Sequence, residues 1–179
     1  MMDATQNEAA HRAASDAELI CWVDEEDRLL GHLVRSDLRQ RGLIGRCTFI
    51  FLFNSKGELC VHRRTLSKAL YPGFWDTAAG GMVAAGESYA DSAARELEEE
   101  LGVAGVALVE HDHFYFADGD SRLWCKSYSA VWDGSLRLQP EEVMEAHFLP
   151  LDVILQEAEQ KPYCPDAQEG LRRYLALRR

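Results

Sequence analysis

The sequence predicts an α+β fold, an α/β/α sandwich in which a mixed β-sheet is covered by helices. Strand-like and helix-like segments are interleaved along the chain, which favours one layered core. Several neighbouring strand-like runs have links of hairpin length, which allow antiparallel pairs within the sheet. The 179 residues favour a single domain, placed at residues 17–179.

The N-terminal part predicts a tail and then a hairpin. Residues 1–16 are polar and show no apolar period, so we expect a mobile tail. Residues 18–24 have the pattern of a short strand, and residues 27–33 are placed to pair back onto it across an acidic turn.

The next segment predicts a short helix and a second hairpin. Ser36 is the expected N-cap of the helix, which ends at Gly42 or Gly45. Residues 47–53 form a dense apolar run, which is typical of a strand buried on both faces. Turn-forming residues then lead to its hairpin partner at residues 58–62.

The remaining elements follow from periodicity and turn residues. A helix is expected over residues 88–101, with Ser88 and Asp91 as a capping box and Gly102 as a left-handed stop. Further strands are expected at 106–116, 123–132 and 147–149, and further helices at 151–160 and 165–179.

Charge and composition exclude several classes of protein. The chain has 30 acidic and 19 basic residues, a net charge of −11, which argues against nucleic-acid binding and against docking on anionic lipid. No apolar run is long enough to span a membrane. The polar N-terminus is no secretory signal, and the five cysteines show no disulfide or zinc spacing. We therefore expect a cytoplasmic protein with buried, reduced thiols.

One helix concentrates the acidic residues that could do chemistry. On a helical wheel, an apolar stripe centres on Leu97, and its other members are Ala90, Ala93, Ala94 and Leu101. Glu96, Glu99 and Glu100 share one flank of this stripe, whereas Glu98 lies on the opposite flank. Clustered carboxylates repel each other and suit a hard divalent cation such as Mg²⁺. An acidic, solvated helix face without a ligand is the alternative.

The spacing of nine residues in this stretch favours a metal site over a solvated acidic face. They are Gly81, Glu87, Arg95, Glu96, Leu97, Glu99, Glu100, Gly102 and Val103. This pattern resembles the Nudix box, the signature of the Nudix hydrolase superfamily, without a departure. The resemblance implies a strand-loop-helix that holds Mg²⁺ or Mn²⁺ against a diphosphate.

The resemblance also assigns roles to single residues. Glu96, Glu99 and Glu100 would be metal ligands, assisted by the carbonyl of Gly80 or Gly81. Arg95 would orient the glutamates through charge-assisted hydrogen bonds, and Glu87 would support the loop.

The implied reaction is metal-dependent hydrolysis of a phosphoanhydride bond in a nucleoside diphosphate-type substrate. It needs charge neutralisation, a metal-activated water and a carboxylate that accepts a proton from this water. The candidate bases outside the box are Glu141, Glu142 and Glu145, and we favour Glu142. The alternative is that these three residues only solvate a loop.

A basic segment upstream of the box contains Arg63, Arg64 and Lys68. Arg64 and Lys68 could clamp the terminal phosphates of the substrate, whereas a solvated basic turn is the alternative. The arrangement is similar to that of uncharacterised Nudix hydrolases related to type 1 isopentenyl-diphosphate isomerase.

An isomerase is the first competing function. The related isomerases carry a catalytic cysteine at the position of Gly80, so only cysteines from other strands, Cys60 and Cys125, could replace it. The second competitor is a non-catalytic module that binds a nucleotide and regulates a partner. Such modules usually lose box glutamates, and this chain keeps all of them. We expect a small-molecule diphosphate as the partner, and its identity stays open. The oligomeric state also stays open, with a homodimer as one option.

Overall fold

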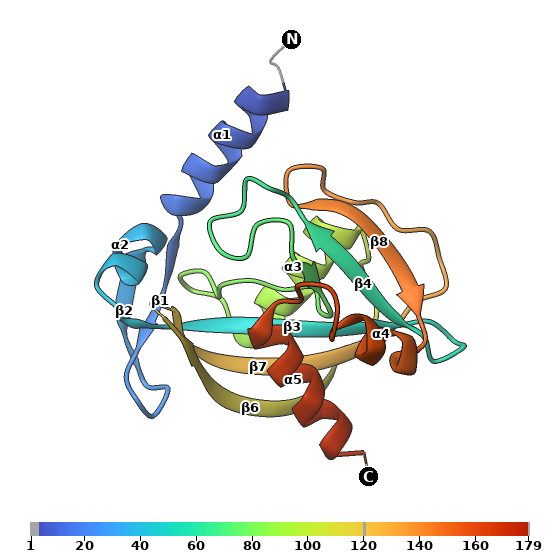
Figure 1. Ribbon diagram of the computed structural model, residues 1–179. Helices are drawn as coiled ribbons and strands as arrows, with labels where there is room; N and C mark the ends of the chain where they lie inside the picture. Colours follow the sequence, from blue (N-terminus) through green and yellow to red (C-terminus); the bar gives the residue numbers. More distant parts are fainter. Residues whose placement is uncertain (1–3, 120, 179) are drawn as a thin grey trace.

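The computed structural model describes residues 4–119 and 121–178. The helices are α1 (Ala4–Asp16), α2 (Arg35–Gln40), α3 (Tyr89–Leu101), α4 (Leu151–Glu157) and α5 (Pro165–Ala176). The strands are β1 (Leu19–Val23), β2 (Leu29–Val34), β3 (Ile44–Phe53), β4 (Leu59–Arg64), β5 (Trp75–Asp76), β6 (Val109–Asp118), β7 (Ser121–Val131) and β8 (Val143–Leu149). The predicted α+β class is confirmed, because helices flank a mixed sheet (Figure 1).

Strand β3 is the centre of the sheet. It pairs antiparallel with β1 and β4 and parallel with β7, while β6 adds to β7 and β8 adds to β4. The parallel ladder is continuous, joining residues 45–53 to residues 123–131. Both predicted hairpins are present, β1 with β2 and β3 with β4.

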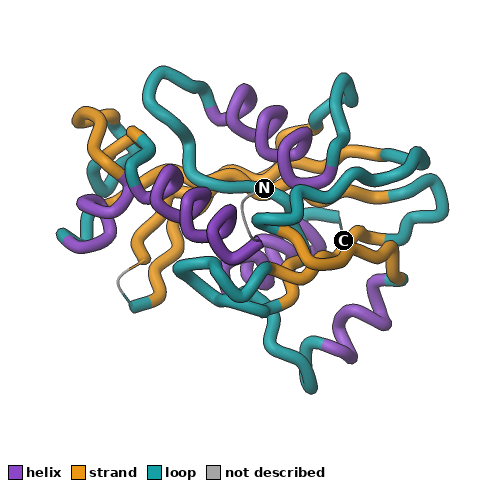
Figure 2. The backbone as a smooth tube through the Cα atoms, turned by 90° about the horizontal axis from the view of Figure 1, so that it is seen from above, coloured by secondary structure: helices purple, strands orange, loops and turns teal. Residues whose placement is uncertain are grey.

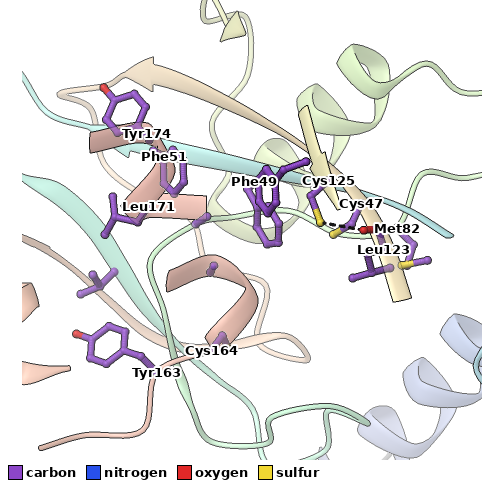
Figure 3. Packing of buried hydrophobic residues seen from close by; sticks show 14 of the residues in the cluster. Cys47, Phe49, Phe51, Met82, Leu123, Cys125, Tyr163, Cys164, Leu171 and Tyr174 are labelled. Atoms are coloured by element: carbon purple, nitrogen blue, oxygen red, sulfur yellow. Dashed lines mark hydrogen bonds between the residues drawn. The ribbon is translucent and has the colours of Figure 1, made fainter. Parts of the chain in front are cut away.

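The apolar run of β3 is explained by burial on both of its faces. Phe49 and Phe51 belong to one hydrophobic cluster, which includes residues of α5, and Figure 3 shows them beside that helix. Ile50 and Leu52 belong to a second cluster, which includes residues of α3. Side chains alternate across a strand, so consecutive residues of β3 anchor different helix layers.

Helix α3 begins and ends as its sequence predicts. The Ser88 side chain accepts a hydrogen bond from the amide of Asp91, and Gly102 has a left-handed conformation with φ of 70°. Each feature satisfies backbone groups that a helix end leaves unpaired.

The predicted buried stripe of α3 is partly wrong. Ala90 and Ala94 are exposed, and the buried residues are Ser92, Ala93, Leu97, Glu100 and Leu101. The helix packs against β3 on the side of Ala93, which turns Glu100 into the protein and leaves Ala90 and Ala94 in solvent. The prediction centred the stripe on the apolar residues alone and so missed the burial of a carboxylate.

Helix α2 forms where expected, but Ser36 is not its N-cap. The capping position is Val34, whose side chain makes no capping bond, and Ser36 lies inside the helix. Strand β2 runs directly into α2. The amide of Arg35, the first residue of the helix, therefore bonds the carbonyl of Glu18, which lies just before β1. This neighbour replaces the side-chain cap that the sequence suggested.

Residues 4–16, expected within a tail, form helix α1 instead. Alanine has the strongest intrinsic helix preference, and this segment is rich in it. In Figure 1, α1 projects from the body of the molecule beside α2. Its C-terminal end is fixed by Asp16, which accepts a bond of 2.8 Å from Arg39, and by Ser15, which accepts one of 3.0 Å from Arg35.

No helix in the described ranges is both long and apolar enough to cross a membrane. Figure 2 gives a second view of the layers, with helices lying on both sides of the strands.

Candidate active site

The loop before α3 lies against the central strand. The amide of Ile50 bonds the carbonyl of Ala79 at 2.7 Å, and the amide of Thr48 bonds the carbonyl of Gly81 at 3.0 Å. Gly81 passes so close to α3 that a Cβ atom there would lie 2.5 Å from a carboxylate oxygen of Glu96. A glycine at this position thus lets the backbone touch the acidic residues of the helix.

Arg95 joins three glutamates. Its Nε donates to Glu87 at 2.7 Å, and its Nη1 donates to Glu96 at 2.9 Å and to Glu99 at 3.0 Å. Glu87 also accepts from the amide of Ala84, which ties the loop to the same arginine. These contacts have the geometry of the orienting and loop-supporting roles that the resemblance implies for Arg95 and Glu87.

Glu96 and Glu100 are unusual because both carboxylates are largely withdrawn from solvent: Glu100 is buried, and the side chain of Glu96 is 14% exposed. Burial raises the pKa of Glu96 to about 7, although the charge of Arg95 acts in the opposite direction. Burial, and then the neighbouring charge of Glu96, raises the pKa of Glu100 well above its ordinary range. The amide of Gly80 donates to Glu100 at 3.2 Å. One arginine and one amide leave this pair of carboxylates short of positive charge.

A divalent cation fits this set of donors. Buried carboxylate oxygens next to each other are the ligands that Mg²⁺ and Mn²⁺ prefer, and a cation would supply the missing charge. Over the described residues, no three His, Cys, Asp or Glu side chains surround a common point. Arg95 holds Glu96 and Glu99, and among the described residues the predicted triad of ligands is not gathered around one point. The amide of Gly80 bonds Glu100, and the role of a Gly80 or Gly81 carbonyl as a metal ligand stays a prediction.

The two predicted phosphate-binding cations lie at the same site, but each already has an acidic partner. Arg64 lies 3.5 Å from Asp76, and its side chain is largely buried. Burial lowers the pKa of Arg64, but the charge of Asp76 and of further acids outweighs this effect and raises it. Lys68 donates to Glu142. Arg63, by contrast, turns away and donates to the carbonyl of Gly73.

The three candidate bases have different surroundings. Glu142 precedes β8 and is mostly buried, with a side chain 13% exposed. Burial raises its pKa, but Lys68 and then His11 outweigh burial, so the pKa is lowered and the carboxylate stays ionised. Glu141 also faces the site. Strand β8 begins earlier than predicted, so Glu145 lies within it and bonds His147 at 3.0 Å.

A cavity of about 540 Å³ collects these groups. Its lining includes the following acidic and basic residues from the predicted site: Arg64, Lys68, Arg95, Glu96, Glu99, Glu100, Glu141 and Glu142. A cavity of this size can hold a small organic phosphate. Gly80 and Gly81 form part of its wall, so the loop, α3 and the segment before β8 meet at one hollow.

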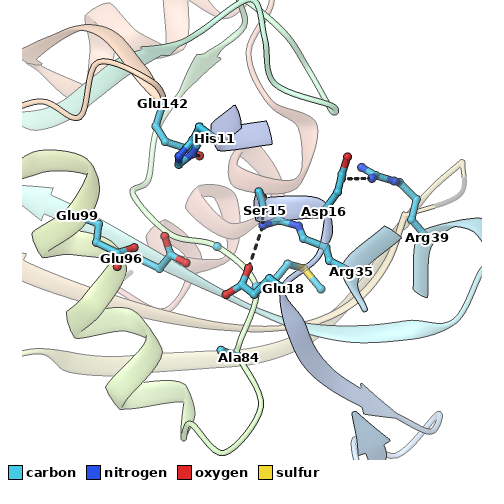
Figure 4. A network of polar contacts seen from close by, with 12 residues as sticks. His11, Ser15, Asp16, Glu18, Arg35, Arg39, Ala84, Glu96, Glu99 and Glu142 are labelled. Atoms are coloured by element: carbon cyan, nitrogen blue, oxygen red, sulfur yellow. Dashed lines mark hydrogen bonds and ion pairs between the residues drawn. The ribbon is translucent and has the colours of Figure 1, made fainter. Parts of the chain in front are cut away.

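Sequence reasoning missed a second group of residues at this cavity. They come from α1, α2 and the start of α5: His11, Arg35, Arg39 and Asp166, with Asp76 from β5. Figure 4 shows His11 beside Glu142, with Arg35 and Arg39 facing the end of α1. No periodicity or motif marks these residues, because their partners are distant in the sequence.

The cysteines give no sign of nucleophilic chemistry. All five are unpaired and buried. Cys60 and Cys125, the two cysteines suggested as approaching the site, do not line the cavity, whereas Cys47 and Cys164 do. Burial raises the pKa of each of these four thiols, so they are poor sources of thiolate.

Comparison with known proteins places this fold and site in one family. The NUDIX domain model matches residues 44–172, which include the loop, α3 and the segment before β8. The chain therefore belongs to the Nudix family. A relative that shares most of its sequence with this chain is named as a Nudix hydrolase, and the chain is a Nudix hydrolase.

One relative is an uncharacterised Nudix hydrolase of Pseudomonas aeruginosa. It is 66% identical over 166 residues, which cover 93% of this chain and 98% of the relative. A solved protein of Deinococcus radiodurans matches with a TM-score of 0.76 and 27% identity, covering 88% of this chain and 99% of that chain. The NUDIX domain of Shewanella oneidensis NrtR, solved with ADP ribose, shares the fold, with a TM-score of 0.59, 18% identity, and coverage of 71% and 83%.

Proposed function

We propose that this protein uses Mg²⁺ or Mn²⁺ to hydrolyse the phosphoanhydride bond of a nucleoside diphosphate-type substrate. The observation that carries the proposal is the cavity of about 540 Å³, which gathers glutamates and basic side chains from separate parts of the chain. Hydrolysis of a diphosphate needs both kinds of group at one place. The ADP ribose bound by the NrtR domain, a diphosphate flanked by sugars, is a ligand of this chemical class.

Each residue has a defined task in this proposal. A bound divalent ion supplies charge neutralisation and lowers the pKa of an attacking water. Glu96, Glu99 and Glu100 would hold that ion, while Arg95 orients the first two. Lys68 and Arg64 would bind the phosphate oxygens, sharing their positive charge with their present acidic partners.

Glu142 is the proposed general base. Its lowered pKa keeps the carboxylate ionised, which a proton acceptor requires. It lies at the cavity wall with Lys68, so a water held near the phosphate would be within its reach. We favour Glu142 over Glu141, because Lys68 and His11 hold the carboxylate of Glu142 at the cavity wall.

The backbone at Gly80 favours hydrolysis over isomerisation of a prenyl diphosphate. A Cβ atom at Gly80 would lie 1.9 Å from the carbonyl oxygen of Thr48, so this backbone has no room for a side chain. A cysteine cannot take the place that it has in the related isomerases without moving the loop. The resemblance to that branch in the basic segment therefore does not by itself favour isomerisation. The five unpaired thiols suit a reducing cytoplasm.

A phosphate-release screen tests the proposal. The substrates are nucleoside diphosphates, nucleotide sugars, ADP-ribose and isopentenyl diphosphate, each with Mg²⁺, with Mn²⁺ and with a chelator. We expect metal-dependent cleavage of a nucleoside substrate, which Glu100→Gln removes and Glu98→Gln keeps.

The same preparation is then incubated with isopentenyl diphosphate in D₂O and followed by NMR. Deuterium exchange into the prenyl chain, or no cleavage of any nucleoside diphosphate in the screen, would contradict the proposed reaction.

A further inference from the structure

Helix α1 forms part of the cavity wall. The residues that it contributes are His11, Arg12, Ala14, Ser15 and Asp16. The family match begins at residue 44, so neither the box nor the match assigns these residues a role. A helix that reaches a catalytic cavity can shape it, block it or hold a catalytic group.

His11 makes the contact that distinguishes these possibilities. Its Nε2 lies 2.6 Å from Oε1 of Glu142, and Lys68 donates to the other oxygen, Oε2. The carboxylate therefore receives one donor on each oxygen, from elements that lie far apart in the sequence. The side chains of Glu142 and Lys68 are mostly buried, and that of His11 is about one-third exposed.

The helix acts as a wall and does not fill the site. The cavity keeps its volume of about 540 Å³ with α1 in place. The contacts of Ser15 with Arg35 and of Asp16 with Arg39 hold the C-terminal end of α1 against α2. His11 lies five residues before Asp16, roughly 7–8 Å along the helix axis at 1.5 Å per residue, so these contacts determine where its imidazole reaches the cavity (Figure 4).

Lys68 alone would leave the carboxylate free to turn. An ammonium on a flexible stem acts as a point charge and fixes little direction, whereas a second donor on the other oxygen sets the plane of the carboxylate. A general base must present its free lone pair to one particular water.

We infer that His11 is a positioning residue of the active site, which with Lys68 fixes the orientation of the Glu142 carboxylate. The inference rests on the proposed function, in which Glu142 accepts the proton of the attacking water. His11 reaches the reaction only through Glu142 and touches neither substrate nor metal. The N-terminal segment is thus part of the catalytic apparatus and not an appendage.

Kinetics with four variants, and with Glu142→Gln as a reference, test this inference. His11→Ala keeps a strong helix former in α1 but removes the donor, so we expect kcat to fall at least tenfold while KM stays within twofold. His11→Gln offers an amide donor and should recover most of the loss. Asn7→Ala, an exposed position one turn earlier on the same helix, should match the wild type. The double variant His11→Ala with Glu142→Gln should be no slower than Glu142→Gln alone.

An unchanged kcat in His11→Ala would overturn the inference, and a raised kcat would show that α1 obstructs the site. A rise in KM without a fall in kcat would also contradict it. So would a fall in kcat that His11→Gln does not recover.

A readout without substrate separates this inference from the proposed function. Hydrogen exchange of the full chain should quicken in α1 for both His11→Ala and Glu142→Gln, and in residues 139–143 for His11→Ala, with Asn7→Ala as the control. If no substrate is hydrolysed, the proposed function fails, but this exchange still decides whether His11 holds Glu142. Exchange in both variants equal to that of the wild type would overturn the contact itself.

Discussion

Arg95 shows how much of the site depends on a single side chain. A guanidinium has donors in a fixed plane, so Arg95 can hold Glu87, Glu96 and Glu99 at once. Glu98, in the same run of acids, has no ion pair with a described residue and is exposed. The three consecutive glutamates, Glu98, Glu99 and Glu100, therefore differ in role although their side chains are identical.

This difference leads to the first prediction. Glu99→Gln should lower kcat by two orders of magnitude or more, because it removes a charge from the metal-binding flank and a partner of Arg95. Glu98→Gln should stay within about threefold of the wild type. Calorimetry with Mn²⁺ should show weakened binding for the first variant only. Similar kinetics for Glu98→Gln and Glu99→Gln would mean that the face of α3 that points into the cavity is assigned wrongly.

Lys68 provides a cleaner test of phosphate binding than Arg64. Lys68→Ala should raise KM for a nucleoside diphosphate, because a phosphate clamp binds ground and transition states alike, and should also lower kcat, because it removes one of the two donors to Glu142. Arg64→Ala would also leave the buried carboxylate of Asp76 without its partner and should destabilise the fold by about 3 kcal/mol. Arg63→Ala, outside the cavity, is the control. Steady-state kinetics that give a normal KM for Lys68→Ala would remove it from the substrate site.

At the residue scale, the sequence predicts contacts only where they are local. Arg95 and Glu99 are one helical turn apart, so their contact follows from spacing. Lys68 and Glu142 are 74 positions apart, and His11 and Glu142 are 131 positions apart. Such pairs depend on how the sheet brings loops together, which no motif in a single chain encodes.

At the scale of elements, the loop between β5 and α3 combines tight packing with unusual backbone angles. Gly80 has φ of 148° and Gly86 has φ of 84°. A Cβ atom at Gly80 would meet the Thr48 carbonyl, whereas one at Gly86 would meet no atom within 4 Å. The two glycines thus share a backbone constraint but differ in their surroundings.

Alanine substitutions at these two glycines should differ in cost. Gly86→Ala should destabilise by about 1 kcal/mol, the usual penalty of positive φ for a residue with a side chain. Gly80→Ala should cost several times more and lower activity, because the loop must move away from β3 to relieve the contact. Thermal unfolding and kcat of both variants measure the difference. Equal melting temperatures of the two variants would show that the loop moves away from β3 at no cost in stability.

The elements differ in how well the sequence reveals them. The caps of α3 are local chemistry, and Ser88 and Gly102 identify both ends correctly. The side of α3 that is buried depends on β3, so the apolar stripe alone misplaced Ala90 and Ala94. Helix α1 lacks an apolar face, so its sequence has no helical periodicity that would predict it, although its alanines favour a helix.

At the scale of the whole molecule, the acidic site should couple stability to pH. Burial raises the pKa of Glu96 to about 7 in the folded chain, whereas an unfolded glutamate titrates near 4.5. The folded state therefore binds this proton more tightly, and the resulting stability is lost as pH rises from about 4.5 to 7. A divalent cation that binds the carboxylates would oppose this loss.

Unfolding in denaturant with a chelator present measures this coupling. Between pH 5 and pH 8, the wild type should lose roughly 2 kcal/mol more of its free energy of unfolding than Glu96→Gln does. Glu98→Gln should follow the wild type, because its carboxylate is exposed. Added Mg²⁺ should stabilise the wild type more at pH 8 than at pH 5. A pH dependence that is the same in all three proteins would contradict the burial of an ionisable group at this site.

The parallel ladder between β3 and β7 has a consequence for how the molecule folds. Every pair in it joins residues 78 positions apart, from Gly45 with Leu123 to Phe53 with Val131. Contacts at such separation form slowly, because a long stretch of chain must close before any of them is made. The loop and α3 lie within that stretch, so a growing chain can pair β3 with β7 only after β7 has left the ribosome. Until then the apolar β3 has no parallel partner, and the nascent protein passes through a stage at which its most hydrophobic strand is open to aggregation.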